Sequence, residues 1–186
     1  MVQETVEAPL VREFTDDQAD FLTPGEVLDA LARITVSALC GATAGVSLLD
    51  RGQLRYITAL SLAATDLECV QERDQAGPGV DAAHDGVPIA VSDLRAPSRR
   101  WPRYQQRLVG HGLACVTAIP MAVDRTVLGT LSVYGSSPRG WSSGDHSVAR
   151  RLIHTAMVRL RLAHSGVPPH DVWQTIVTAI AVADGL

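Results

Sequence analysis

Residues 114–134 have the sequence ACVTAIPMAVDRTVLGTLSVY, two apolar segments rich in β-branched residues on either side of the polar pair Asp124-Arg125. A short polar break between two such segments predicts a β-hairpin. If Asp124 and Arg125 form a two-residue turn, Val123 faces Thr126 and the pairing continues outward from there. We expect the rest of the fold to assemble around this hairpin.

The register of the hairpin assigns each side chain to one face of the sheet. With Met121 opposite Leu128 and Cys115 opposite Tyr134, one face is apolar or small and suits packing under helices. Its members are Val116, Ala118, Pro120, Ala122, Val127, Gly129, Leu131 and Val133. The other face is mixed and predicts the wall of a small-molecule cavity, although its Thr and Ser side chains would equally bond to each other or to water. Its members are Cys115, Thr117, Ile119, Met121, Leu128, Thr130, Ser132 and Tyr134.

The composition is that of a globular chain with one core. Of 186 residues, 46% are hydrophobic, and the net charge of −4 gives no general attraction to nucleic acid or to an anionic membrane. All sixteen basic residues are Arg, which is typical of a GC-rich, bacterial genome. Cys40, Cys69 and Cys115 are widely spaced, so neither a disulfide framework nor a zinc site is indicated. No signal peptide or membrane-spanning segment is recognised, and we expect a cytoplasmic protein.

The chain divides into an N-terminal arm at residues 1–22, a domain at 23–164, and a linker with a short C-terminal helix at 165–186. Thr23-Pro24-Gly25-Glu26 combines a capping box with a proline at the first helical position, so a helix is expected to follow and to end near Gly41. Further elements are expected in order: a hairpin at 44–59, one or two helical turns within 61–76, a short helix at 80–86, a strand at 88–91, a brief helix ending at 110, the central hairpin, a helix at 143–163, and a last helix from 171.

This order predicts an α+β fold. The strands gather into an antiparallel sheet of five or six strands, with the N-terminal and C-terminal helices on one face. The segment at 62–86 is left to cover the other face. Together these elements predict a cavity between the sheet and that segment.

The order of motifs resembles a GAF domain, the small-molecule sensor module of bacterial signalling proteins, and most closely the actinobacterial type that precedes an RNA-binding ANTAR segment. The resemblance covers roughly residues 24–164. The residues that carry it are Ala44-Gly45-Val46-Ser47-Leu48-Leu49-Asp50, residues 76–86, Pro88-Ile89-Ala90-Val91-Ser92-Asp93-Leu94, Arg100-Trp101-Pro102, and residues 127–134. It implies a PAS-like antiparallel sheet, signalling through flanking helices, and a homodimer.

Several patterns of GAF relatives are missing. Val80 stands where relatives of this type often have Cys, and the NKxnFxxxDE pattern of cyclic-nucleotide binders is absent. No Cys-His pair is available to attach a bilin, and the three Cys do not have the spacing of free methionine sulfoxide reductases. No ANTAR-like sequence is recognised after His164. The resemblance therefore leaves the ligand, the cofactor and the output partner unknown.

Two polar clusters have functional interpretations. Asp81, His84 and Asp85 share one side of the short helix and would form the edge of a ligand cavity or supply two metal ligands, although a solvated helix face is the simpler interpretation and no further metal ligand is found. Five arginines at 95–107, interleaved with Trp101 and Tyr104, would hold an anion or stack on nucleic-acid bases. A solvated loop with Trp101 packed onto the domain is the simpler interpretation, and the acidic chain disfavours nucleic acid.

Isolated residues carry weaker signals. Cys69 and Cys115 would serve as redox-sensing thiols or simply as small buried side chains. His111 would meet a haem or another ligand, or have no special task in its loop. Ser143-Gly144-Asp145-His146 contains the residue types of a catalytic triad, but its position predicts a helix cap. No catalytic residues are assigned, and we predict that the chain is not an enzyme.

The sequence therefore predicts a regulatory module that binds a small molecule or partner, forms a homodimer, and does not bind membranes or nucleic acid. The candidate ligand-binding residues are Tyr56, Cys69, Asp81, His84, Trp101, His111, Cys115 and Thr117, with no metal ligands assigned. One alternative is a thiol-dependent reductase, which requires Cys69 and Cys115 close together. Another is a ligand-free interaction scaffold, which requires a filled cavity.

Overall fold

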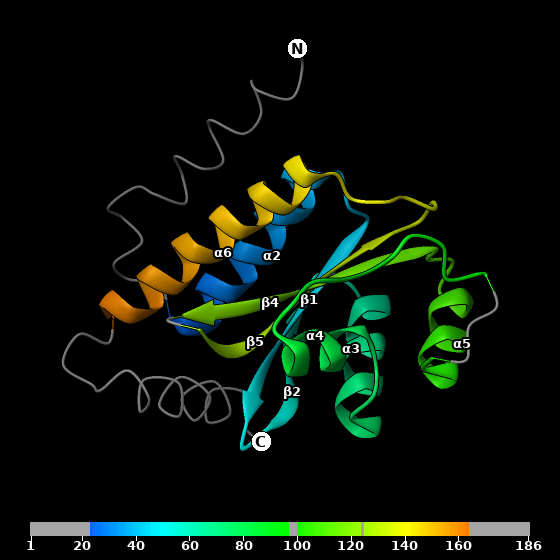
Figure 1. Ribbon diagram of the computed structural model, residues 1–186, viewed down its shortest axis with the longest axis horizontal. Helices are drawn as coiled ribbons and strands as arrows, with labels where there is room; N and C mark the ends of the chain where they lie inside the picture. Colours follow the sequence, from blue (N-terminus) through cyan, green and yellow to red (C-terminus); the bar gives the residue numbers. More distant parts are fainter. Residues whose placement is uncertain (1–22, 97–99, 124, 164–186) are drawn as a thin grey trace, which may run out of the picture.

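The computed structural model describes residues 23–96, 100–123 and 125–163. Its sheet has five antiparallel strands in the order β2-β1-β5-β4-β3, with helices on both faces (Figure 1). The strands are β1 (Thr43–Asp50), β2 (Gln53–Ala59), β3 (Ile89–Val91), β4 (Cys115–Val123) and β5 (Thr126–Gly135). The helices are α2 (Pro24–Leu39), α3 (Leu62–Asp74), α4 (Pro78–Asp85), α5 (Pro102–Gly110) and α6 (Ser143–Ala163). The predicted α+β architecture is confirmed, and the expected helix from residue 171 lies outside the described residues.

The central hairpin forms, but its predicted register is correct only next to the turn. Val123 pairs with Thr126 as expected, and then the register shifts between Met121 and Ala122, so that Met121 pairs with Gly129. A β-bulge of this kind puts one extra residue in one strand and turns the following side chains to the opposite face. On β4 the predicted faces are therefore wrong: Ile119 packs in the core under α2 and α6, and Val116 packs on the other side.

Helices α2 and α6 lie side by side on one face of the sheet (Figure 1). The capping box predicted for α2 is present, because the Thr23 hydroxyl accepts from the Glu26 N–H and the Glu26 carboxylate accepts from the Thr23 N–H. Ser142 begins α6 in a similar way by accepting from the Asp145 N–H. This face is a continuous apolar core, whose central buried members are Leu28, Leu31, Val46, Leu48, Met121, Leu131, Leu152, Met157 and Leu160.

Helices α3 and α4 cover the opposite face, and α5 packs against α3 (Figure 1). The expectation of only one or two turns at 61–76 is wrong, since α3 is a 13-residue helix capped by the Ser61 hydroxyl. Its apolar pattern is weak because Glu68 and Gln71 occupy buried positions that usually hold apolar side chains. A second, smaller apolar cluster fills the space between α3, α5 and the sheet, with Leu67, Leu94, Leu108, Val116 and Tyr134 among its members.

Candidate functional site

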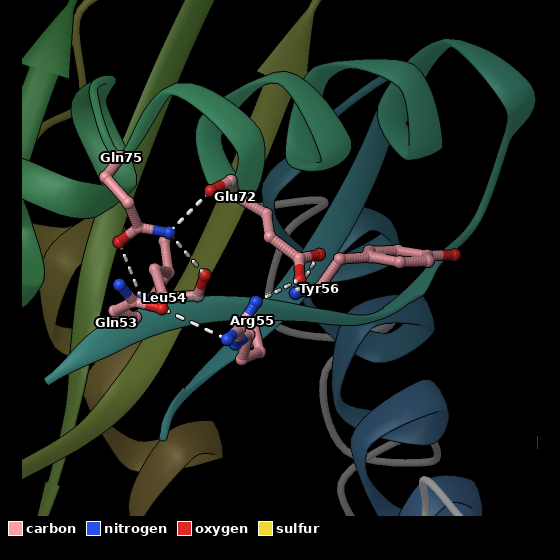
Figure 2. A network of polar contacts seen from close by, with 6 residues as sticks. All are labelled: Gln53, Leu54, Arg55, Tyr56, Glu72 and Gln75. Atoms are coloured by element: carbon pink, nitrogen blue, oxygen red, sulfur yellow. Dashed lines mark hydrogen bonds and ion pairs between the residues drawn. The ribbon is translucent and has the colours of Figure 1, made fainter. Parts of the chain in front are cut away.

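Side chains of α3 and of Gln75, the residue that caps its C-terminus, hold this helix against the outer edge of strand β2 (Figure 2). The Gln75 amide accepts from the Leu54 N–H at 3.0 Å and donates to the Leu54 carbonyl at 2.9 Å, as a neighbouring strand would. The Glu72 carboxylate accepts from the Tyr56 N–H at 3.1 Å and from the Arg55 guanidinium at 3.2 Å. These contacts satisfy the exposed backbone of an edge strand and fix which side of α3 faces the sheet.

The side of α3 that faces the sheet carries a carboxylate. Ala64, Glu68 and Gln71 recur at helical spacing on this side, and all three are completely buried. A carboxylate is rarely fully buried without partners, because removing it from water is costly. Glu68 therefore identifies a part of the core that contains buried polar groups in place of the usual apolar side chains.

The Glu68 carboxylate accepts hydrogen bonds from three different elements. Tyr134 of β5 donates its hydroxyl at 2.6 Å, Ser47 of β1 donates at 2.8 Å, and the Gln71 amide donates at 3.2 Å. The Tyr104 hydroxyl of α5 donates to that of Tyr134 at 3.3 Å. The polar cluster, defined here as Ser47, Glu68, Gln71, Tyr104 and Tyr134, thus connects two helices with two strands.

Glycines on the neighbouring elements make room for this cluster. A Cβ atom at Gly45 of β1 would lie 2.5 Å from Cγ of Glu68, so no larger residue fits there unless the carboxylate moves. A Cβ atom at Gly77 would lie 2.4 Å from Oε1 of Gln71, and that oxygen accepts from the Gly79 N–H at 2.6 Å. Gln71 therefore ties the start of α4 to the polar cluster.

Burial dominates the protonation of the cluster. It raises the pKa of Glu68 above the ordinary 4.5, against the opposing effect of the hydrogen bonds from Tyr134, Ser47 and Gln71 and of the nearby Ser132 hydroxyl, which does not reach hydrogen-bond geometry. Burial and the neighbouring Glu68 carboxylate raise the pKa of Tyr134 and Tyr104 well above that of a free phenol, so both stay neutral donors. Burial therefore favours the uncharged form of Glu68 more than water does.

Two buried hydroxyls beside the cluster have no hydrogen-bond partner among the described residues. They belong to Thr130 and Ser132, which are fully buried on β5. Alternation along β5 turns both toward the α3/α4 side, where a Cβ atom at Gly79 would lie 3.1 Å from the Thr130 hydroxyl. Buried hydroxyls are usually bonded, so this pair marks unused hydrogen-bonding capacity next to Glu68.

The space expected to be hollow is filled by the protein's own side chains. Glu68, Gln71, Tyr104 and Tyr134 occupy the region between the sheet and the helices that cover it, each with at most 1% of its surface exposed. The prediction of a standing cavity there is therefore wrong. The sequence analysis did not consider the polar side chains of the covering helices as occupants of this space.

The eight candidate residues do not converge on one site. Cys115 and Thr117 share the face of β4 that carries Ile119, which packs under α2 and α6. The others belong to the opposite side, where Tyr56 bonds Thr65 of α3 at 3.4 Å and Trp101 packs against the second apolar cluster. Cys69, His84 and His111 are exposed, and Asp81 is half-buried. A shared site for Tyr56, Cys69, Asp81, His84, Trp101, His111, Cys115 and Thr117 is thus not formed.

The two thiols of the reductase hypothesis lie on different sides of the sheet. Cys69 is exposed on α3, whereas Cys115 is buried and donates to the Ser137 carbonyl at 3.2 Å. Burial, together with Glu72, Asp66 and Glu68, raises the pKa of Cys69, and burial raises that of Cys115. Neither environment favours the thiolate that such chemistry requires.

The histidines and carboxylates pair with close neighbours. Nδ1 of His84 lies 2.9 Å from the Asp85 carboxylate, and Arg100 donates to Asp81 at 2.5 Å. Among the described residues, no three His, Cys, Asp or Glu side chains are arranged to hold a metal ion. None of the described helices is long and apolar enough to cross a membrane.

Residues 140–144, Gly-Trp-Ser-Ser-Gly, match the letters G-x-S-x-G of a nucleophile elbow, which the sequence analysis overlooked. The structure uses this serine differently. The Ser142 hydroxyl accepts from the Asp145 N–H at 3.1 Å, and Asp145 accepts from the Ser142 N–H at 2.9 Å. This segment thus forms a helix cap, as expected, and Ser142 caps the N-terminus of α6.

The sequence analysis missed the polar cluster as a site and placed only its Tyr134 on a predicted cavity wall, the mixed face of the hairpin. Thr130, Ser132 and Tyr134 were placed together on that face, and the structure confirms it. The missing signal was the spacing of Ala64, Glu68 and Gln71, which is that of a buried helix side. The sequence analysis made no use of Glu68 and Gln71, so it missed both the length of α3 and the site.

An antiparallel sheet with helices α2 and α6 paired on one face and a helix-covered polar cluster on the other defines the class of this α+β module. The chain belongs to the GAF-domain family, whose model matches residues 21–161. GAF domains are sensory and ligand-binding modules of signalling proteins. No curated protein matches the chain.

Solved structures show the same fold at low sequence identity. A GAF domain/HD domain protein from Geobacter sulfurreducens is similar with a TM-score of 0.62 and 20% identity, covering 79% of this chain and 99% of that chain. The GAF domain of a phosphoenolpyruvate-protein phosphotransferase from Coxiella burnetii has a TM-score of 0.65 at 13% identity, over 89% and 97% of the two chains. A free methionine-R-sulfoxide reductase from Neisseria meningitidis, solved with its substrate, has a TM-score of 0.58 at 14% identity, over 89% and 92%.

Proposed function

We propose that this GAF domain is a non-enzymatic regulatory module in which the polar cluster around Glu68 responds to a small polar molecule. The molecule would enter between β5 and the helices α3 and α4, and would take up the unused hydroxyls of Thr130 and Ser132. Entry requires α4 to move, because Gln71 joins the start of α4 to Glu68. Binding would thus be coupled to a displacement of the covering helices.

The observation that carries this proposal is the buried Glu68 carboxylate beside two unpartnered hydroxyls. Apolar residues of similar volume would fill the same space at lower cost. Such groups are retained at functional sites more readily than in ordinary cores. A ligand that donates to Glu68 and bonds the two hydroxyls would satisfy all three groups at once.

A ligand-free interaction scaffold is the second candidate, favoured by the filled space. In that case, Glu68, Tyr134 and Tyr104 would serve only to join α3, β5 and α5. The scaffold needs no entry route, and its covering helices would stay closed. A thiol-dependent reductase is not favoured, because Cys69 and Cys115 lie on different sides of the sheet and both pKa values are raised.

Native mass spectrometry of freshly purified full-length protein separates the first two candidates. The regulatory module retains a small molecule, or acquires one from a metabolite extract, and the Thr130→Val/Ser132→Ala double variant loses it. A matched control is Thr155→Val, which removes a partly exposed hydroxyl on α6 that donates to the Arg151 carbonyl. A wild-type protein that neither carries nor acquires a small molecule overturns the proposal and favours the ligand-free interaction scaffold.

Homodimer formation stays a prediction. The apolar stripe of α6 that was to support it is used within the domain, since Leu152, Ala156 and Leu160 are buried against the rest of the core. Light scattering at high concentration tests the dimer, and a monomer contradicts it. A cytoplasmic location, an actinobacterial origin close to modules that precede ANTAR segments, and the division at residues 22 and 164 are proposed on the sequence alone.

A further inference from the structure

A polar hollow of about 490 Å³ lies between α3 and α5, outside the region of the polar cluster. Its lining consists of Arg73, Arg103, Gln106, Arg107, Gly110 and His111. The spacing of the four α5 residues places them along one side of that helix. Arg73 comes from the last turn of α3, so the hollow is formed by two helices that pack together.

Positive charge exceeds negative charge around this hollow. Asp74 lies 2.8 Å from Arg73, and Asp66 lies 2.8 Å from Nε2 of His111. These two carboxylates are also the partners of Arg103 and Arg107, but at 3.6 Å in both cases. Three guanidinium groups therefore share two carboxylates.

The long contacts leave Arg103 and Arg107 with unused donor capacity. A charge-assisted N–H···O bond is normally about 2.7–2.9 Å long, and each guanidinium has five N–H donors. The two side chains are 77% and 57% exposed, so both can turn toward a solute. The carbonyls that end α5 accept from the backbone of His111, Gly112 and Leu113, which satisfies the negative end of the helix.

We propose that this hollow binds the diphosphate group of a small phosphorylated molecule. Arg103 and Arg107 would each contact phosphate oxygens in the forked geometry that guanidinium groups favour, and Arg73 would contact them from α3. The charge of three guanidinium groups is matched better by two adjacent phosphates than by a single carboxylate. The volume lies within the range of about 300–1,000 Å³ that is usual for small-molecule sites.

An anion held in this way would join the two helices that carry Glu68 and Tyr104. Arg103 and Arg107 flank Tyr104 on α5, and Arg73 follows Glu68 on α3 by little more than one turn. Binding would therefore reduce the independent motion of α3 and α5. The proposal does not require a ligand at the polar cluster, so the two ideas can fail separately.

Isothermal titration calorimetry of the full chain with sodium pyrophosphate at low ionic strength tests the site. We expect saturable binding to one site, weakened by at least about tenfold in the Arg103→Gln/Arg107→Gln double variant, because two charge-assisted contacts are lost. The control is Arg150→Gln/Arg151→Gln, which removes the same charge from exposed positions on α6. Circular dichroism confirms that both variants are folded.

Three outcomes overturn the proposal. They are absence of saturable binding to the wild type, equal weakening in both double variants, and tighter binding of a short random RNA that competes with pyrophosphate. A nucleoside diphosphate that binds more tightly than pyrophosphate, with the same dependence on Arg103 and Arg107, supports the proposal and identifies the phosphorylated molecule as a nucleotide. Equal affinity for both compounds supports a site for the diphosphate group alone.

Discussion

The two faces of the sheet carry different kinds of buried side chain. The face under α2 and α6 is a continuous apolar core, whereas the face under α3 and α4 contains a buried carboxylate, an amide and paired phenols. Apolar burial stabilises the fold in proportion to its area, while buried polar groups offset their desolvation only through their hydrogen bonds. The comparison teaches that the α2/α6 face supplies most of the apolar core, whereas the α3/α4 face depends on a network of buried hydrogen bonds beside a smaller apolar cluster.

The largest expected effect is on the apolar face. Leu131 on β5 is completely buried in the α2/α6 core, and Leu131→Ala is expected to lower the free energy of unfolding by about 2–5 kcal/mol, since it leaves a cavity. Urea denaturation measures the loss. Val158→Ala on α6, where the side chain is 41% exposed, is the control and should change stability by less than about 0.5 kcal/mol. Equal losses in both variants would contradict the assignment of this face.

The next effect concerns the close contact between β1 and α3. Gly45→Ala is expected to destabilise the fold by about 1–3 kcal/mol, because the new Cβ would lie 2.5 Å from Cγ of Glu68. Glu68→Ala removes that atom, so the double variant Gly45→Ala/Glu68→Ala should be more stable than the sum of the two single losses predicts. Chemical denaturation of all four proteins gives the coupling energy. Strict additivity would show that Glu68 does not fill the space beside Gly45.

A smaller effect is expected in the pH dependence of stability. The pKa of Glu68 is raised in the folded state above 4.5, so the folded protein binds this proton more tightly than the unfolded chain. The contribution of Glu68 to stability is therefore greatest below the unfolded pKa and is lost as the pH rises from about 4.5 through the folded pKa.

Glu68→Gln cannot titrate and should remove this decline. Denaturation midpoints measured between mildly acidic and neutral pH give the difference between wild type and variant. Glu72→Gln is the matched control, because Glu72 is a partly exposed carboxylate on the same helix. A wild type that gains stability relative to Glu68→Gln as the pH rises would contradict the direction of the pKa shift.

The sequence predicted one face far better than the other, for a physical reason. Apolar spacing and caps identify the helices of the α2/α6 face, because hydrophobic periodicity directly reflects burial there. On the α3/α4 face, Glu68 and Gln71 occupy buried positions of α3, although these residue types are usually exposed. Their helical spacing therefore indicates burial, while their polarity indicates exposure. The bulge between Met121 and Ala122 was equally hidden, since a register shift leaves the composition of both strands unchanged. The arrangement of strands was predictable, but the contents of the polar cluster were not.

The smallest effect distinguishes two buried hydroxyls. Thr130→Val removes a hydroxyl that has no partner among the described residues, so stability should stay unchanged or rise by up to about 1 kcal/mol. Thr43→Val on β1 is the matched control, because the Thr43 hydroxyl is bonded to that of Ser61 at 2.9 Å and its removal should cost about 1 kcal/mol. Thermal denaturation monitored by circular dichroism compares the two.

Equal losses in both variants would mean that the Thr130 hydroxyl is satisfied, and the argument for unused hydrogen-bonding capacity beside Glu68 would fail. A gain at Thr130 would instead show that the wild-type protein keeps a hydroxyl that weakens its own fold. Such a group gains a hydrogen bond when a molecule other than the protein reaches it, as the proposed site requires. The stability of the unliganded protein would then itself be evidence that the α3/α4 face is built to receive one.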